Sequence, residues 1–112
     1  MEKTRYIRVP KNQKAVKDYD NGIIEDNQVE EILLTQEVFD ELYKSGVFSI
    51  INDKCDIIID DYEDEVLTLE KVPVALEVVN DLCSVNTSNN LKELKRMLEL
   101  ALKYKTIVGF DF

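Results

Sequence analysis

The chain has 112 residues, of which 45% are hydrophobic, and its formal net charge is −9. This length suits one domain with a single core, and the hydrophobic share is ordinary for a folded protein. No apolar run approaches the roughly 18 residues that a membrane span needs, and the basic start lacks the apolar stretch of a signal peptide. We therefore expect a single domain, residues 1–112, that works in the cytoplasm and has no membrane partner.

The charge is distributed unevenly along the sequence. Residues 1–18 contain six basic and two acidic side chains, residues 19–70 contain two basic and 16 acidic, and residues 71–112 contain six basic and five acidic. An acidic middle would repel phosphate, which argues against nucleic acid as a direct ligand. It favours a basic protein partner, whose approach it would accelerate. The alternative is that the acidic residues serve solubility alone.

The residue types that carry most catalytic and metal chemistry are scarce. The chain has no histidine, two cysteines and three scattered glycines. This excludes histidine-based triads, falls short of a four-ligand zinc site and leaves no phosphate-binding loop. Residues 18–22 lack the glycine position and the last ligand of a calcium loop. We expect no catalytic residues, no metal and no cofactor. We interpret Cys55 and Cys83 as buried thiols, with a disulfide or a reactive thiol as the alternatives.

The first third of the chain predicts two strands separated by a long loop. Residues 4–10 alternate and end at a proline, which indicates a strand. Residues 12–28 are polar and predict a long turn or loop, with residues 23–24 as a short edge strand inside it. The pattern of residues 31–34 is ambiguous and favours a strand.

The middle of the chain predicts helix and then strand. Thr35 is a typical N-cap, and the apolar residues after it recur at helical spacing. Gly46 is expected to end that helix. Residues 47–51 predict a second, short helical turn, with a strand as the alternative. Residues 55–59 are rich in β-branched residues, which predicts a buried strand. The acidic residues 60–65 should then be exposed at the strand end or in a hairpin.

The last third predicts a strand, two helices and a final strand. Residues 66–69 predict the first of these strands, and Pro73 is expected in the first turn of the next helix. Residues 86–90 predict a loop before a strongly amphipathic helix. Residues 106–110 predict a terminal strand paired inside a sheet. The sequence therefore predicts a single α+β domain, with a mixed or antiparallel sheet and about three to four helices packed on it.

Two acidic clusters are the candidate binding sites. The first is residues 60–65, five acidic residues around Tyr62, which is either a solvated turn or an epitope with an aromatic anchor. Paired carboxylates also suit acid–base chemistry, but that needs a cleft and one carboxylate in apolar surroundings. The second cluster lies in the predicted early loop and the strand after it. The candidate partner-binding residues are Asp60, Asp61, Tyr62, Glu63, Asp64, Glu65, Asp20, Glu25, Asp26, Glu30 and Glu31.

Four segments carry a family resemblance: residues 34–39, 45–48, 60–63 and 106–112. With them the chain resembles the small cognate immunity proteins of bacterial toxin systems, such as contact-dependent growth inhibition. The resemblance implies a cytoplasmic protein that binds a basic toxin domain, typically a nuclease, and blocks its active site with an acidic surface. A DNA-mimic inhibitor of the kind that phages encode predicts the same surface. Two further alternatives are a non-enzymatic adaptor, whose apolar helix faces contact a partner, and, ranked last, an enzyme that uses carboxylates and a bound divalent ion.

Overall fold

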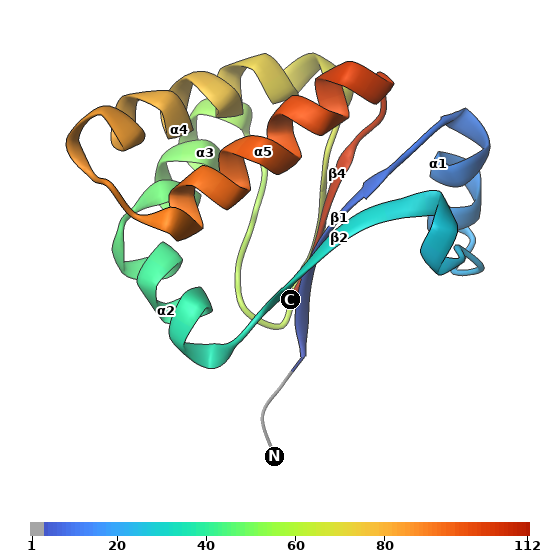
Figure 1. Cartoon of the computed structure of the whole chain (residues 1–112), viewed down its shortest axis with the longest axis horizontal. Helices are drawn as coiled ribbons and strands as arrows, with labels where there is room; N and C mark the ends of the chain where they lie inside the picture. The colour runs from blue at the N-terminus through green and yellow to red at the C-terminus, as the bar shows by residue number, and fades with distance from the viewer. Residues whose placement is uncertain (1–3) are drawn as a thin grey trace.

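Four antiparallel strands form one sheet, in the order β2-β1-β4-β3, in the computed structural model, which describes residues 4–112 (Figure 1). The strands are β1 (Arg5–Pro10), β2 (Val29–Leu34), β3 (Asp64–Leu67) and β4 (Val108–Asp111). Four of the five longer predicted strands are confirmed, with shifted ends, and the last one is paired on both sides. Residues 1–3, part of the basic start of the sequence, lie outside the described residues.

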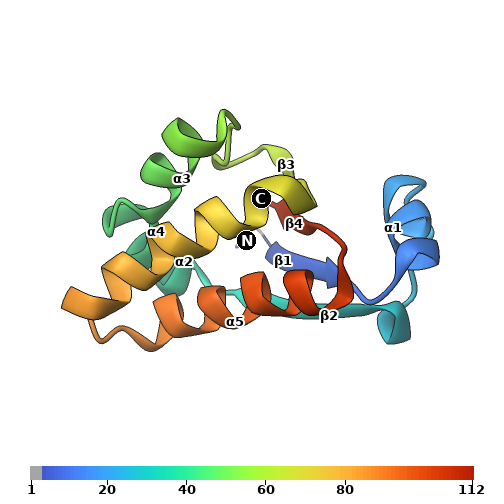
Figure 2. The same ribbon diagram turned by 90° about the horizontal axis from the view of Figure 1, so that it is seen from above.

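Five α-helices occur within residues 4–112: α1 (Gln13–Asp20), α2 (Gln36–Lys44), α3 (Val47–Cys55), α4 (Val72–Val85) and α5 (Asn89–Tyr104). Two short 3₁₀ turns, η1 (Asp26–Gln28) and η2 (Leu69–Lys71), complete the list. Helix α5 packs on β1 and β4, α4 packs on α5, and α3 packs on α4, whereas α1 lies apart from these helices (Figure 2). The α+β class is confirmed, with more helices than predicted. Within residues 4–112 no helix is both long and apolar enough to cross a membrane.

The core lies between one face of the sheet and the helices α2 to α5. Ile7 and Val9 of β1 and Val108 and Phe110 of β4 are fully buried there, and each such side chain contributes about 1.5–3 kcal/mol by burial. Successive side chains of a strand point to opposite faces. The alternate residues of these strands therefore lie on the other face, which α2 to α5 leave open.

The sequence predicted a long loop over residues 12–28, but residues 13–20 form α1 and residues 26–28 form η1, and residues 23–24 form no strand. The side chain of Asn12 caps α1, because its Oδ1 accepts a hydrogen bond from Ala15 N at 2.8 Å. Ala15 is fully buried, and α1 packs against β1. The helix is short and mostly polar, so it has too few apolar positions for a periodicity to show in the sequence. Its stability comes from the cap and from packing on the sheet.

Residues 55–59 are not a strand either. Helix α3 continues to Cys55 and ends at Asp56, which has a left-handed φ of 54°. The Asn52 side chain then fixes the segment, since its Oδ1 accepts from Ile59 N at 2.7 Å and its Nδ2 donates to Ile59 O at 2.9 Å. These bonds satisfy the backbone locally in place of a strand partner. The β-branched run is therefore an irregular segment, and Ile58 within it is 66% exposed.

The two cysteines lie on different helices and form no disulfide. Cys55 is buried at the end of α3, as predicted, and burial raises the pKa of its thiol. Cys83 on α4 is half-buried, so the prediction of two buried thiols is wrong for this residue.

Candidate protein-interaction surface

The open face of the sheet forms the floor of a hollow of about 550 Å³. All four strands contribute to this floor, with Arg8 of β1, Glu31 of β2, Val66 of β3 and Asp111 of β4. In the register of the sheet, Arg8 lies opposite Glu31 on one side and Gly109 on the other. Helix α1 and the connection from α1 to β2 form the wall of the hollow.

Carboxylates dominate the lining of this hollow. Seven of its residues are acidic and one is basic, which leaves a formal charge of −6 out of the −9 of the whole chain. The acidic residues are Asp20, Glu25, Asp26, Glu31, Asp64, Glu65 and Asp111, and the basic residue is Arg8. A concave surface of one sign focuses the electric field and raises the local concentration of an oppositely charged partner.

Arg8 organises the carboxylates of the floor. Its Nε donates to Glu31 Oε2 at 2.9 Å and its Nη1 donates to Asp111 Oδ2 at 2.7 Å, so it links both neighbours of β1. Its guanidinium also lies over the Tyr6 ring, 4.1 Å from the ring centroid. Burial by itself would lower the pKa of Arg8, but the hydrogen bonds to Glu31 and Asp111 outweigh it, and the pKa is raised. The two floor carboxylates are therefore held in place by a permanent cation.

Tyr19 attaches α1 to the sheet at the same point. Its hydroxyl donates to Asp111 Oδ1 at 2.6 Å. A Cβ on Gly109 would lie 2.0 Å from that hydroxyl oxygen, so glycine is needed here for close approach. Burial, followed by the hydrogen bond to Asp111, strongly raises the pKa of Tyr19. The phenol therefore remains a hydrogen-bond donor at physiological pH.

Polar contacts also fix the rim of the hollow between α1 and β2. Asp18 accepts from Gln28 Nε2 at 2.7 Å and from Lys14 Nζ at 2.6 Å. The hydrogen bond from Gln28, followed by that from Lys14, lowers the pKa of Asp18. The backbone N–H of Glu25 donates to Gln28 Oε1 at 2.9 Å. Next to these contacts are three exposed rim residues: Asp20, Glu25 and Asp26.

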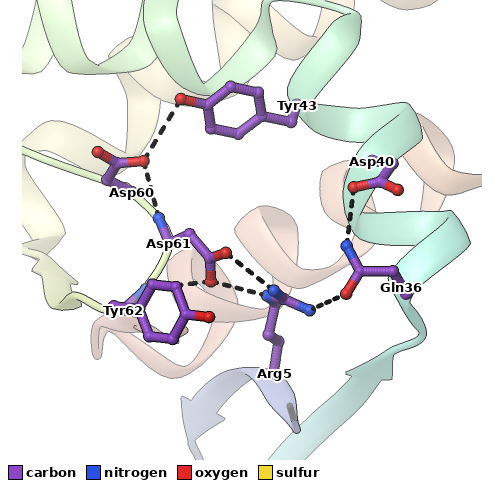
Figure 3. A network of polar contacts seen from close by, with 7 residues as sticks. All are labelled: Arg5, Gln36, Asp40, Tyr43, Asp60, Asp61 and Tyr62. Carbon is purple, nitrogen blue, oxygen red and sulfur yellow. Dashed lines mark hydrogen bonds and ion pairs between the residues drawn. The ribbon is translucent and has the colours of Figure 1, made fainter. Parts of the chain in front are cut away.

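Asp61, inside the acidic run 60–65, contacts a buried arginine. Arg5 is 3% exposed, and it donates from Nε and Nη2 to the two oxygens of Asp61 at 3.0 and 2.9 Å (Figure 3). Its Nη1 donates to Gln36 Oε1 at 3.0 Å, and its guanidinium lies 4.2 Å from the centroid of the Phe39 ring. The hydrogen bond to Asp61 raises the pKa of Arg5 against the opposing effect of burial. Asp61 therefore holds the start of β1 against the segment that leads to β3.

The structure brings part of each predicted acidic cluster into the hollow and leaves the rest outside it. Six of the candidates line the hollow, namely Asp20, Glu25, Asp26, Glu31, Asp64 and Glu65. The other candidates, Asp60, Asp61, Tyr62, Glu63 and Glu30, are not part of its lining. Glu30 lies opposite the buried Val9 in the register, so it points to the covered side of the edge strand. Whether any of the candidates contacts a partner stays a prediction.

Three residues of the hollow were missed in the sequence: Arg8, Tyr19 and Asp111. The alternation of the last strand could have indicated Asp111, because it points to the face opposite the apolar Val108 and Phe110. Arg8 likewise points to the face opposite Ile7 and Val9. Nothing in the sequence indicated Tyr19, because the prediction placed it in a loop.

The fold and the open face define a small, acidic α+β protein with an electronegative hollow on one side of its sheet. No protein-family model and no curated protein sequence matches the chain. Among solved structures, the chain is similar to the Neisseria DNA mimic protein DMP12, with a TM-score of 0.67 and 19% sequence identity. The match covers 99% of this chain and 100% of that one, so the two proteins share a fold over their whole described lengths.

This similarity corrects the family resemblance drawn from the sequence. The interpretation as an immunity protein of contact-dependent growth inhibition is wrong, and so is the toxin partner, because the full-length match is to a DNA mimic protein. The segments behind that interpretation are general features of folded chains. Thr35 caps α2 by accepting from Val38 N at 3.2 Å, and Gly46 supplies a left-handed turn with φ 83°.

Proposed function

We propose that this protein is a DNA mimic, which binds a DNA-binding protein through the acidic hollow and keeps that protein off DNA. The observation that carries the proposal is the charge of the open sheet face, seven carboxylates against one guanidinium around a single hollow. The shared fold with a protein named as a DNA mimic supports it.

The electrostatics of DNA recognition explain how such a surface can compete. Duplex DNA carries about one negative charge per 1.7 Å of its axis, and its binding proteins place lysine and arginine against the phosphates. These phosphate contacts supply much of the affinity and do not depend on base sequence. A set of carboxylates offers the same cations ion pairs without any base edges. Since Arg8 and Tyr19 already fix Glu31 and Asp111, little side-chain freedom is lost on binding.

The polar residues on the floor suit a binding surface better than an active site. A general acid or base works best with a pKa near the operating pH. Burial instead raises the pKa of Tyr19 further above its ordinary value, and its proton is directed at Asp111. Asp111 also accepts a hydrogen bond from Arg8. We therefore propose a non-enzymatic inhibitor that acts in the cytoplasm, where it meets DNA-binding proteins.

The test is a competition for a DNA-binding partner. The tagged protein is used to recover basic proteins from its native lysate, and the recovered partner is then bound to fluorescent duplex DNA. Added protein should displace the DNA, less effectively as salt rises. The double variant Glu25→Lys with Asp26→Lys, on the rim, should lose at least about tenfold in affinity, or 1.4 kcal/mol.

A matched control separates the location of the charge from its amount. Glu77 and Asp81 are exposed on α4, away from the hollow, and Glu77→Lys with Asp81→Lys changes the net charge equally. This control should keep most of the affinity. Equal losses in the two double variants would mean that net charge, and not the hollow, binds the partner. Failure of the wild type to displace DNA would refute the proposal.

A further inference from the structure

Strand β2 lies at one edge of the sheet and pairs only with β1 in the described part of the chain (Figure 1). The hydrogen bond from Lys11 N to Gln28 O, at 2.9 Å, shows which backbone groups of β2 face β1. Backbone N–H and C=O groups alternate between the two sides of an antiparallel strand. The residues that bond β1 are therefore Glu30, Ile32 and Leu34. Those with N–H and C=O groups directed to the open edge are Val29, Glu31 and Leu33.

An apolar groove lies beside this edge. It has a volume of about 260 Å³ and is bounded by the end of β2, by α2 and by the start of α5. Its apolar lining consists of Ile32, Leu33, Leu34, Val38 and Leu42. Leu33 lines the groove and is 57% exposed. The open backbone edge and the groove together match the two parts of a strand-addition site, main-chain bonds and a side-chain pocket.

The charge around the edge determines the kind of segment that fits it. Residues 25–37, which include β2 and both of its connections, contain five acidic residues and no basic one. A second copy of this chain would bring the same acidic strand, and like charges directly opposite each other oppose pairing. A lysine- or arginine-rich segment would instead form ion pairs with Glu30 and Glu31.

We propose that β2 accepts an extended basic segment of a protein partner as a fifth strand, with one apolar side chain of that segment in the groove. Main-chain hydrogen bonds to Val29, Glu31 and Leu33 supply the affinity, and the groove sets the register. The identity of the partner rests on the proposed function, since DNA-binding proteins often carry basic extended segments. The strand-addition site itself rests on the backbone of β2 and on the groove.

The site is tested with a short peptide of alternating lysine and valine, followed by NMR hydrogen exchange of the β2 amides. In the free protein the amides of Glu31 and Leu33 should exchange faster than those of Ile32 and Leu34, which bond β1. Bound peptide should slow the exchange of Glu31 and Leu33 by about tenfold or more. The same peptide with N-methylated backbone nitrogens should give no such protection.

Two substitutions at one position separate the backbone from the side chain. Leu33→Pro removes an outward N–H and leaves every hydrogen bond to β1, because proline is tolerated at edges of this kind. Leu33→Thr removes the apolar side chain and keeps the N–H. The proline variant should lose about tenfold or more in peptide affinity, and the threonine variant should lose less. Circular dichroism checks that both are folded.

The outcomes for the strand site and for the DNA mimic are distinguishable. Absence of protection at Glu31 and Leu33, or equal peptide affinity of wild type and Leu33→Pro, would overturn the strand addition. If the wild type displaces duplex DNA from the partner and Leu33→Pro displaces it equally well, the mimic stands without the strand site. If the peptide protects β2 but no DNA is displaced, the strand site stands and the mimic falls.

Discussion

The acidic segments at residues 20–31 and at residues 60–65 look alike in sequence but differ in the fold. In the second segment, Asp61 neutralises the buried Arg5, and only Asp64 and Glu65 reach the hollow. In the first segment, Asp20, Glu25 and Asp26 remain exposed on the rim. The density of acidic residues along a chain therefore does not locate a binding surface. The decisive point is where the fold places each carboxylate. Glu31 pairs with Arg8 and still lines the hollow, whereas Asp61 pairs with a buried arginine outside it.

The largest expected effect comes from breaking the ion pair between the buried Arg5 and Asp61. Asp61→Asn should lower the free energy of unfolding by about 3 kcal/mol, because Arg5 keeps its charge and loses its partner. Urea unfolding measures this change. The control Glu63→Gln, at an exposed neighbour, should change the free energy by less than about 0.5 kcal/mol. A loss as small as that of Glu63→Gln would show that Asp61 contributes no more to the free energy of unfolding than an exposed carboxylate.

The next effect sharpens the comparison from the side of the hollow. Gly109→Ala should cost about 2 kcal/mol, because the new Cβ displaces the Tyr19 ring and separates its hydroxyl from Asp111. In a Tyr19→Ala background the same change should cost at least about 1 kcal/mol less, and a double-mutant cycle of urea unfolding measures this coupling. Additive costs would mean that the Tyr19 ring does not pack on Gly109.

The smallest effect concerns the acid stability of the rim. Since the pKa of Asp18 is lowered in the folded state, its contribution is present above the ordinary value of 3.8 and is lost as the pH falls through the lowered pKa. Asp18→Asn should therefore slightly reduce the urea midpoint at neutral pH and leave it unchanged at the most acidic pH. Asp20→Asn, an exposed neighbour, is the control. A midpoint difference that persists at acidic pH would contradict this linkage.

The elements with many core residues were predictable from the sequence. Helix α5 buries Leu91, Leu94, Leu98 and Ala101 at helical spacing, and the pattern indicated this face directly. Helix α1 was missed because its stability depends on the Asn12 cap and on contact with β1. The run 55–59 was missed because the side chain of Asn52 replaces a strand partner, and composition does not reveal such a contact.

The candidate surface was predictable in part. The sequence indicated the rim residues Asp20, Glu25 and Asp26 by charge, but not that they share a hollow with Asp64. Arg8 and Asp111 become neighbours only through the pairing of β1 with β4, across 103 residues of sequence. Periodicity is a local property and does not show which strands pair.

The pairing of β1 with β4 also determines when the acidic floor can exist. A contact between residues this far apart requires closure of a long loop, and such contacts form late in folding. A chain still being synthesised lacks the floor until β4 has been made, whatever helices it already contains. Incomplete or partly unfolded molecules therefore have scattered charges in place of an assembled face. On this view, the acidic face is assembled only as folding is completed.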